Sequence, residues 1–171
     1  MVWLPALLVP NQAVLMKNHP FRSVLFVCLG NICRSPLAEG VFRAFLVAEG
    51  KGEGILIDSA GTNGYHTDEP PDPRSIAVAG KYGIDISSQR CRQLTADDYT
   101  RFDLIAGMDR TNVAAIEARR PLNARAQIGL FYGIASGATL DIPDPYYGTN
   151  GDFERVYRMI LAASTGLSKA F

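Results

Sequence analysis

Short apolar runs of strand length alternate along the chain with segments whose apolar residues recur at helical spacing. Residues 23–28, SVLFVC, form an apolar run that is typical of a buried strand. Pro36 fits the first turn of a helix through LAEGVFRAFLVAEG, where apolar residues recur every three or four positions, and Gly50 fits its end. This alternation predicts an α/β domain built on a parallel sheet.

The same pattern predicts the other elements. Thr95 and Asp109 are expected to be helix N-caps. Helices are expected over residues 74–82, 95–101, 110–120 and 153–167, and further strands at residues 55–59, 103–108 and 126–131. The sheet is therefore predicted to have four parallel strands wrapped by helices. Ligands of such sheets bind beyond the carboxyl ends of the strands, so the loop after residue 28 is the first candidate site.

Chain length and net charge limit the number of domains and the classes of partner that the protein can have. The chain has 171 residues, of which 47% are hydrophobic, and this is enough for one domain with a sizeable core. Its 17 basic and 17 acidic residues leave no positive excess. Neither nucleic acid nor an anionic membrane is therefore expected as a partner, and any chemistry on phosphate has to come from a local site.

Residues 1–22 are predicted to be an N-terminal extension without a catalytic role, followed by a single domain over residues 23–171. The extension starts with an apolar segment that Pro5 and Pro10 interrupt and that is too short to span a membrane as a helix. It lacks the positively charged start of a signal peptide. Met16 offers an alternative start of the protein.

The cysteines and histidines argue against a disulfide scaffold and against a metal centre. The three cysteines, Cys28, Cys33 and Cys91, are odd in number and form no CxxC pair. The two histidines, His19 and His66, lie far apart in the sequence. Reduced thiols in a cytoplasmic protein without a metal are the simpler interpretation.

The loop CLGNICRSP, residues 28–36, has the composition of an anion cradle between a strand and a helix. Backbone N–H groups and the helix N-terminus attract an anion there. Gly30 and Asn31 tolerate the left-handed backbone that such a loop requires. The same field lowers the pKa of a thiol, so Cys28 is a candidate nucleophile. Arg34 can bind two phosphate oxygens, and Ser35 can donate to the sulfur when the cysteine leaves.

Non-catalytic interpretations and other phosphate-binding motifs were possible for this loop. Cys28 could be a buried structural cysteine at a strand end, since free cysteine is often buried. The loop lacks the Gly-Lys-Ser/Thr of a Walker loop, and it is no G-x-G-x-x-G dinucleotide turn. The preceding strand, the Gly-Asn interior and Pro36 favour the catalytic interpretation.

Thiolate attack on a phosphate monoester also requires a proton for the departing oxygen, and Asp144 is the candidate donor. It stands in Asp-Pro-Tyr-Tyr, where Pro145 stiffens the chain and the two tyrosines can form an aromatic wall. Alone, an Asp-Pro pair is more typical of a turn, and Asp141 lies nearby. Together with the Cys28 loop, the catalytic interpretation of Asp144 prevails.

With these motifs the chain resembles the low-molecular-weight protein-tyrosine phosphatases. The likeness covers residue 23 to the C-terminus. It rests on ordered motifs: VLFVCLGNICRSP, DSAGT, PDPR, YGID, FDLIAGMD and IPDPYYG. The resemblance implies a flavodoxin-like three-layer α/β sandwich and no metal or cofactor. It implies hydrolysis of phosphotyrosine and aryl phosphates through a phosphocysteine, with Cys28 as nucleophile, Arg34 as phosphate clamp and Asp144 as general acid.

Further roles follow from the same resemblance. Tyr65 takes the place of a specificity aromatic, and His66 in the same loop either contacts substrate or does nothing. Ser59 resembles a serine that holds the phosphate loop together with Asn31, although a purely local hydrogen bond is an equal alternative. The residues predicted to bind substrate are Leu29, Gly30, Asn31, Ile32, Cys33, Ser35, Tyr65, Tyr146 and Tyr147.

Two positions depart from the pattern or leave it open. Tyr82 stands where some members carry a histidine that supports Asn31, so the support of the loop is in question. Cys33 either packs or forms a reversible disulfide with Cys28 that shields the nucleophile. Cys91 has no partner at motif spacing and is interpreted as incidental.

Three other functions fit this sequence less well. Arsenate reductases share the anion loop but need further cysteines, which Cys91 alone supports poorly. A phosphate- or phosphopeptide-binding module would need neither Cys28 nor Asp144, and a flavin-binding protein would need no thiol-and-arginine loop. The family suggests a phosphotyrosine protein as partner, such as a bacterial tyrosine kinase, with phosphate or other oxyanions as product or inhibitor. A monomer is the default expectation.

Overall fold

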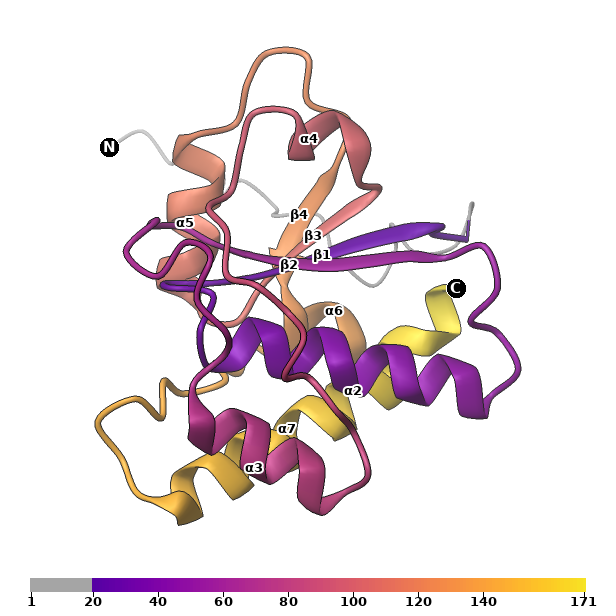
Figure 1. The fold of residues 1–171 in the computed structure, drawn as a ribbon. Helices are drawn as coiled ribbons and strands as arrows, with labels where there is room; N and C mark the ends of the chain where they lie inside the picture. Colours follow the sequence, from indigo (N-terminus) through magenta and orange to yellow (C-terminus); the bar gives the residue numbers. More distant parts are fainter. Residues whose placement is uncertain (1–19) are drawn as a thin grey trace, which may run out of the picture.

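The four strands form one parallel sheet, as the sequence predicts. The computed structural model describes residues 20–171 (Figure 1). The strands are β1 (Ser23–Cys28), β2 (Leu56–Gly61), β3 (Leu104–Gly107) and β4 (Gln127–Leu130). They pair in the order β2-β1-β3-β4, so the chain leaves β1 to one side and later returns on the other. The loop after β1 therefore lies where the strand order reverses, the preferred ligand position of such sheets.

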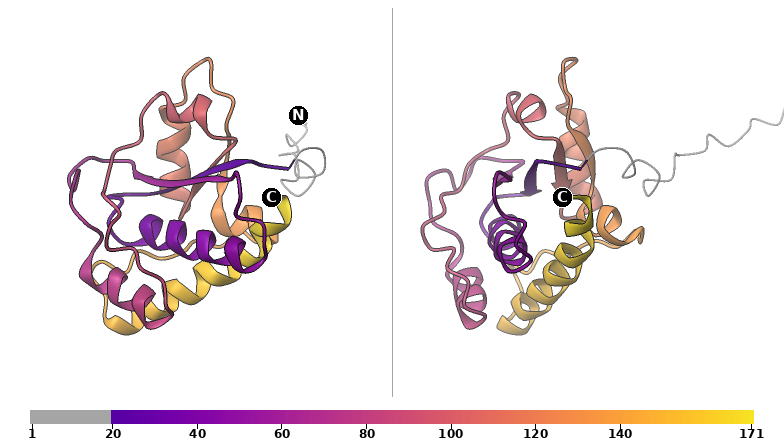
Figure 2. Two further views of the ribbon diagram at one scale, coloured as in Figure 1. Left: turned by 45° about the vertical axis from the view of Figure 1, so that its right-hand side comes forward. Right: turned by 90° about the vertical axis from the view of Figure 1, so that its right-hand side faces the viewer.

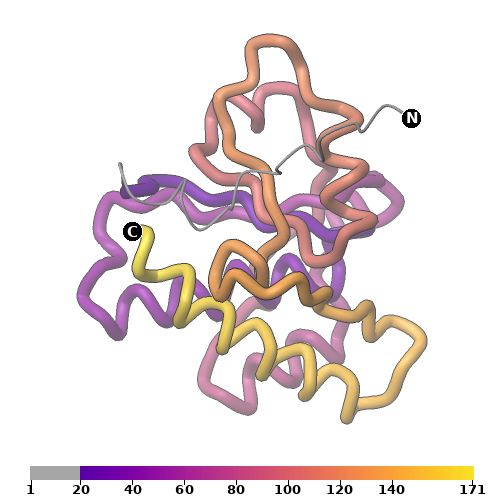
Figure 3. The backbone as a smooth tube through the Cα atoms, turned by 180° about the vertical axis from the view of Figure 1, so that it is seen from behind, coloured from indigo at the N-terminus to yellow at the C-terminus, as the bar shows by residue number. Residues whose placement is uncertain are grey.

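Helices cover both faces of the sheet (Figure 2). They are α2 (Arg34–Ala48), α3 (Pro73–Lys81), α4 (Asp98–Arg101), α5 (Arg110–Ala118), α6 (Phe131–Ser136), α7 (Asn150–Leu167) and the 3₁₀ helix η1 (Ser168–Ala170). The helices α2, α6 and α7 pack against one face, and Figure 3 shows from behind how α7 runs beside α6. The helices α4 and α5 pack against the other face.

Strand β1 is buried on both faces because its side chains alternate between two cores. Val24 and Phe26 join the core under α2 and α7. Leu25 and Val27 join the smaller core with α4 and α5. This alternation explains the unbroken apolar run in the sequence, and it holds the end of β1, and with it Cys28, in a fixed position.

The structure corrects two local predictions. The N-cap of α4 is Asp97 rather than Thr95, which lies two residues earlier, and the N–H and hydroxyl of Thr95 donate to the Asp98 carboxylate at 2.8 and 3.1 Å. The fourth strand ends at Leu130, and the next residues form α6, where Phe131 turns into the core. Asp109 is confirmed as the N-cap of α5.

Most of the predicted extension lies outside the described residues. Its last residues meet the C-terminal end of the chain: the N–H of Phe21 donates to the Ala170 carbonyl at 2.7 Å. The ring of Phe21 lies 5.7 Å from that of Phe171. The boundary at residue 22 stays a prediction. Within residues 20–171, every helix is too short or too polar to cross a membrane.

Phe26→Ala is expected to lower the free energy of unfolding by about 3–5 kcal/mol, because it empties the centre of a close-packed core. The Phe26 ring lies 4.8 Å from that of Phe131 and 5.6 Å from that of Phe42. Urea denaturation measures the change, with Leu122→Ala at a fully exposed leucine as the control that leaves stability almost unchanged. Equal effects of the two substitutions would refute this assignment of the core.

Candidate active site

The segment from Cys28 to Ser35 connects β1 to α2 as a tight loop. Asn31 has a φ of 55°, the left-handed conformation expected inside an anion cradle. The amides of Thr62 and Asn63 each donate at 2.9 Å to a carbonyl at the start of the loop. Gly61 approaches so closely that an added Cβ would lie 2.9 Å from the Asn31 nitrogen. The loop is thus held against the end of β2, and glycine is needed there.

The sulfur of Cys28 lies at the base of the loop, in a residue of which only 2% is exposed. It lies 3.1 Å from the hydroxyl of Ser35, which also lies 3.2 Å from the Ala60 carbonyl. The sulfur faces the N-terminus of α2, a helix of 15 residues. The N-terminal end of a helix and a hydroxyl therefore lie beside this atom, a position that favours an anion.

Arg34 is a buried cation that gathers carboxylates from distant parts of the chain. Its Nη1 donates to Asp109 at 2.5 Å and to the Ile142 carbonyl at 3.0 Å. Its Nη2 donates to Asp144 at 3.1 Å, across 110 positions of sequence. Burial alone would lower the pKa of Arg34, but Cys28 and the two carboxylates together raise it. Arg34 therefore stays charged at the base of the site.

The structure distinguishes the two candidate acids. Asp144 contacts Arg34 and accepts from the amide of Tyr146 at 3.1 Å, and 42% of its side chain stays exposed. Asp141 instead pairs with Arg110, which lowers the pKa of Asp141. Of these two, Asp144 lines the cavity above Cys28.

A cavity of about 300 Å³ opens above the sulfur, and it has aromatic walls. Tyr65 and Tyr147 are highly exposed to solvent, at 85% and 98%. The rings of Tyr146 and Tyr147 meet edge to face, 4.9 Å apart. The cavity is lined by Cys28, Leu29, Gly30, Ile32, Cys33, Asn63, Tyr65, His66, Asp144, Tyr146 and Tyr147. Most of the predicted site residues therefore share one cleft.

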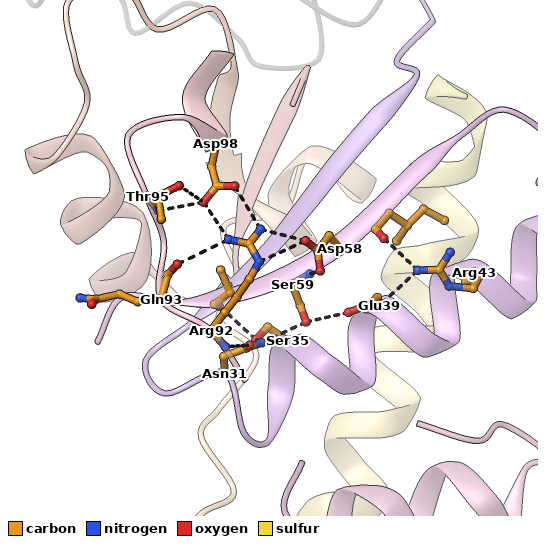
Figure 4. A network of polar contacts seen from close by, with 12 residues as sticks. Asn31, Ser35, Glu39, Arg43, Asp58, Ser59, Arg92, Gln93, Thr95 and Asp98 are labelled. Atoms are coloured by element: carbon orange, nitrogen blue, oxygen red, sulfur yellow. Dashed lines mark hydrogen bonds and ion pairs between the residues drawn. The ribbon is translucent and has the colours of Figure 1, made fainter. Parts of the chain in front are cut away.

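Two predicted substrate-binding residues, Asn31 and Ser35, lie behind the cavity rather than in its wall. Asn31 donates through Nδ2 to the hydroxyl of Ser35 at 2.9 Å and to that of Ser59 at 3.0 Å (Figure 4). Ser59 in turn donates to the carboxylate of Glu39 at 2.7 Å. The expectation that Ser59 holds the loop together with Asn31 is confirmed.

Tyr82 does not support Asn31, so the support of the loop is arranged differently from that of the members with a histidine. Tyr82 follows α3, and its ring stacks on that of Tyr157 in α7 at 4.0 Å, while its hydroxyl contacts Glu154. It therefore lies on the side of the molecule where α3 packs against α7. The side-chain oxygen of Asn31 accepts instead from the amide of Arg92, at 2.8 Å.

Sequence reasoning missed two further contacts. Asp109 was interpreted only as a helix cap, but it also binds Arg34. Its position directly after β3 was an available signal, because parallel strands end at the same edge of a sheet. Cys91, interpreted as incidental, is buried, and its thiol donates to the Asn31 carbonyl at 2.7 Å.

The three cysteines are free thiols. Burial, together with the nearby Cys28, raises the pKa of Cys91 to about 11. Burial and the carboxylate of Asp72 raise the pKa of Cys33. These two thiols therefore stay protonated near neutral pH. The reversible disulfide between Cys28 and Cys33 stays a prediction.

Comparison with known proteins gives a consistent result. Residues 23–171 match the family model described as "Low molecular weight phosphotyrosine protein phosphatase". The Homo sapiens protein of that name is 41% identical over 145 residues, which cover 84% of this chain and 91% of the human protein. A low molecular weight protein-tyrosine-phosphatase of Streptomyces coelicolor is 42% identical over 151 residues, 86% of this chain and 92% of that protein.

Solved structures agree with the sequences. A protein tyrosine phosphatase from Entamoeba histolytica, with Hepes in its active site, matches with a TM-score of 0.79 and 34% identity over 85% of this chain and 93% of that one. Vibrio vulnificus Wzb, in complex with benzylphosphonate, matches with a TM-score of 0.78 and 30% identity over 88% of this chain and 99% of that one.

Glu39→Gln is expected to change how stability depends on pH. Burial raises the pKa of Glu39, so the folded chain keeps this proton to a higher pH than the unfolded chain. As the pH rises above the ordinary value of 4.5, the unfolded chain releases the proton first, and the wild type loses stability relative to Glu39→Gln. Urea unfolding of both proteins from mildly acidic to neutral pH measures this. A wild type that instead gains stability over that window would contradict the raised pKa.

Proposed function

The chain belongs to the low molecular weight phosphotyrosine protein phosphatase family, and we propose that Cys28, Arg34 and Asp144 carry the reaction. The enzyme is a protein-tyrosine phosphatase that hydrolyses phosphotyrosine and aryl phosphate monoesters. One observation supports the assignment most directly. The buried Arg34 contacts Asp144 at 3.1 Å, and Asp144 lines the same cavity as Cys28.

In the first step the Cys28 thiolate attacks phosphorus. The sulfur–phosphorus bond forms as the ester oxygen–phosphorus bond breaks, and the proton of the Asp144 carboxyl group passes to the departing phenol oxygen. The amides of the loop and the guanidinium of Arg34 stabilise the charge on the phosphoryl oxygens. The exposure of Asp144 supports this role, because the phenol part of the substrate lies on the open side of the cleft.

In the second step the carboxylate of Asp144 takes a proton from water. The water oxygen attacks phosphorus, the sulfur–phosphorus bond breaks, and inorganic phosphate leaves with Cys28 restored as a thiolate. The Ser35 hydroxyl, 3.1 Å from the sulfur, stabilises the departing thiolate. Because the product is itself an oxyanion that fits the cradle, phosphate and similar oxyanions are expected to inhibit.

The shape of the cleft supports phosphotyrosine as the substrate. The sulfur lies at the base of the cavity, and Tyr65, Tyr146 and Tyr147 rise around its mouth. A phenyl ring reaches from the loop to these walls and packs against them. The shorter phosphoserine side chain places no ring there, so these aromatic walls favour aryl phosphates.

The proposed partner is a phosphotyrosine protein, with a bacterial tyrosine kinase as the candidate. The proposed setting is the cytoplasm, because the three cysteines are free thiols and the reaction needs a reduced Cys28. Every group in the proposed mechanism comes from one chain, so a monomer suffices.

The first test compares wild type, Cys28→Ser and Asp144→Ala in hydrolysis of p-nitrophenyl phosphate and phosphotyrosine without added metal. Cys28→Ser is expected to have no turnover, and Asp144→Ala to lose about 100-fold or more in kcat with phosphotyrosine. The loss is expected to be smaller with p-nitrophenyl phosphate, because its leaving oxygen is a weaker base. Asp141→Ala is the matched control and keeps most of the activity. A reduced wild type without turnover would overturn the proposal, and an arsenate-dependent thiol oxidation assay then tests reductase chemistry.

Tyr147→Ala and Tyr65→Ala are expected to lower kcat/KM for phosphotyrosine about two- to tenfold each, through loss of aromatic contact with the substrate. Turnover of a small alkyl phosphate should stay unchanged, because no ring reaches these walls. Tyr82→Ala removes an exposed tyrosine outside the cleft and serves as the control. Equal losses with aryl and alkyl substrates would count against the aromatic walls as the source of preference.

A further inference from the structure

A three-residue segment, Cys91–Gln93, runs along the phosphate loop and is called the strap here. It continues the sheet beside the end of β2: the amide of Gly61 donates to the Arg92 carbonyl at 2.8 Å, and Gln93 bridges to Gly61. The strap therefore lies beside the end of β2 and outside the lining of the cleft. None of its residues lines the cavity.

The strap binds one residue of the loop at two points. The Cys91 thiol donates to the backbone carbonyl of Asn31 at 2.7 Å. The Arg92 amide donates to the side-chain oxygen of Asn31 at 2.8 Å. Asn31 is the loop residue with a φ of 55°, a left-handed conformation that asparagine tolerates better than most residues, and these two contacts hold it there.

The side chain of Arg92 holds the strap in place between two carboxylates (Figure 4). Its Nε and Nη2 donate to Asp58 at 3.1 and 2.9 Å. Its Nη1 and Nη2 donate to Asp98, both at 3.0 Å. Asp58 lies in β2 and Asp98 begins α4, so the planar guanidinium ties the strap to two separate elements.

The hydrogen bonds that follow from this clamp run in one direction toward the sulfur. With its oxygen bound to the Arg92 amide, the Asn31 amide must point its two N–H bonds at the hydroxyls of Ser35 and Ser59. Ser35 then uses its oxygen as an acceptor, and its single proton is left for the Cys28 sulfur at 3.1 Å or the Ala60 carbonyl at 3.2 Å. The orientation of Ser35 thus depends on the strap.

We propose that Arg92 is a positioning residue for the reaction at Cys28: its clamp on Asp58 and Asp98 holds the strap, the strap orients Asn31, and Asn31 directs the hydroxyl of Ser35 toward the sulfur. The inference rests on the proposed function, in which that hydroxyl stabilises Cys28 as a thiolate. Arg92 touches neither substrate nor sulfur, so its effect falls on turnover rather than on binding of the phosphate.

The experiment measures kcat, KM and inhibition by inorganic phosphate for Arg92→Ala and Arg92→Lys with p-nitrophenyl phosphate. Arg92→Ala is expected to lower kcat about tenfold while KM and phosphate inhibition change by less than about twofold. Arg92→Lys keeps the charge but loses the planar fork, so it is expected to recover part of kcat.

Tyr99→Phe is the matched control for a loss of stability alone. It removes the buried hydrogen bond from the Tyr99 hydroxyl to the Ile116 carbonyl, 2.7 Å long, in the helix that Asp98 begins. Thermal unfolding is followed for all variants. Tyr99→Phe is expected to lower Tm and leave kcat unchanged, whereas Arg92→Lys lowers kcat even where Tm is close to that of the wild type.

A double-mutant cycle with Ser35→Ala tests the route of the effect. If Arg92 acts through Ser35, Arg92→Lys lowers kcat in the wild type and has little further effect in Ser35→Ala. Multiplicative losses, or a folded Arg92→Ala with full kcat, overturn the positioning role. Failure of the proposed function gives a different result, since the wild type itself would then be inactive.

Discussion

A buried guanidinium is the interaction on which the rest of the site depends. Arg34 has only 2% of its surface exposed, and an isolated charge at that depth is strongly unfavourable. Asp109, the Ile142 carbonyl and Asp144 satisfy it. These partners come from the end of β3 and from the loop before α7. Pairing this one cation therefore draws two distant segments to the loop after β1 and places the candidate acid beside the candidate nucleophile.

The opposite side of the loop depends on hydrogen bonds of a different kind. There the loop carries the left-handed Asn31 rather than a buried charge. Two successive hydrogen bonds between neutral groups support it: the Arg92 amide donates to the Asn31 side chain, and that side chain donates to Ser35. The charged pairs with Asp58 and Asp98 stand one layer further out. Cys28 is thus near enough to the buried cation to raise the pKa of Arg34, and its sulfur lies 3.1 Å from the Ser35 hydroxyl.

The sequence predicted the parts whose signals are local. The run of β1, the left-handed Asn31 and the Asp109 cap depend on neighbours within a few residues, and all three have the expected form, whereas Gly30 does not adopt a positive φ. The pairing of Arg34 with two carboxylates and the contact of the strap with Asn31 could not be predicted, because these contacts join residues 75, 110 and 61 positions apart. Two local predictions failed because the local signal fits more than one structure. Thr95 lies two residues before Asp97, the N-cap of α4, and its hydroxyl donates to Asp98. A short apolar run fits a strand or a helix equally well, and Phe131 begins α6.

The alternation of β1 between two cores has a consequence for how this protein can diverge in evolution. One residue inserted in or deleted from that strand would exchange the contents of the cores on the two faces and turn the cysteine away from its cradle. Changes of length are instead tolerated in exposed turns, such as those around Gly54 and Leu122. Descendants of this chain should therefore differ in the lengths of their turns, while the number of residues between the start of β1 and the nucleophile stays fixed.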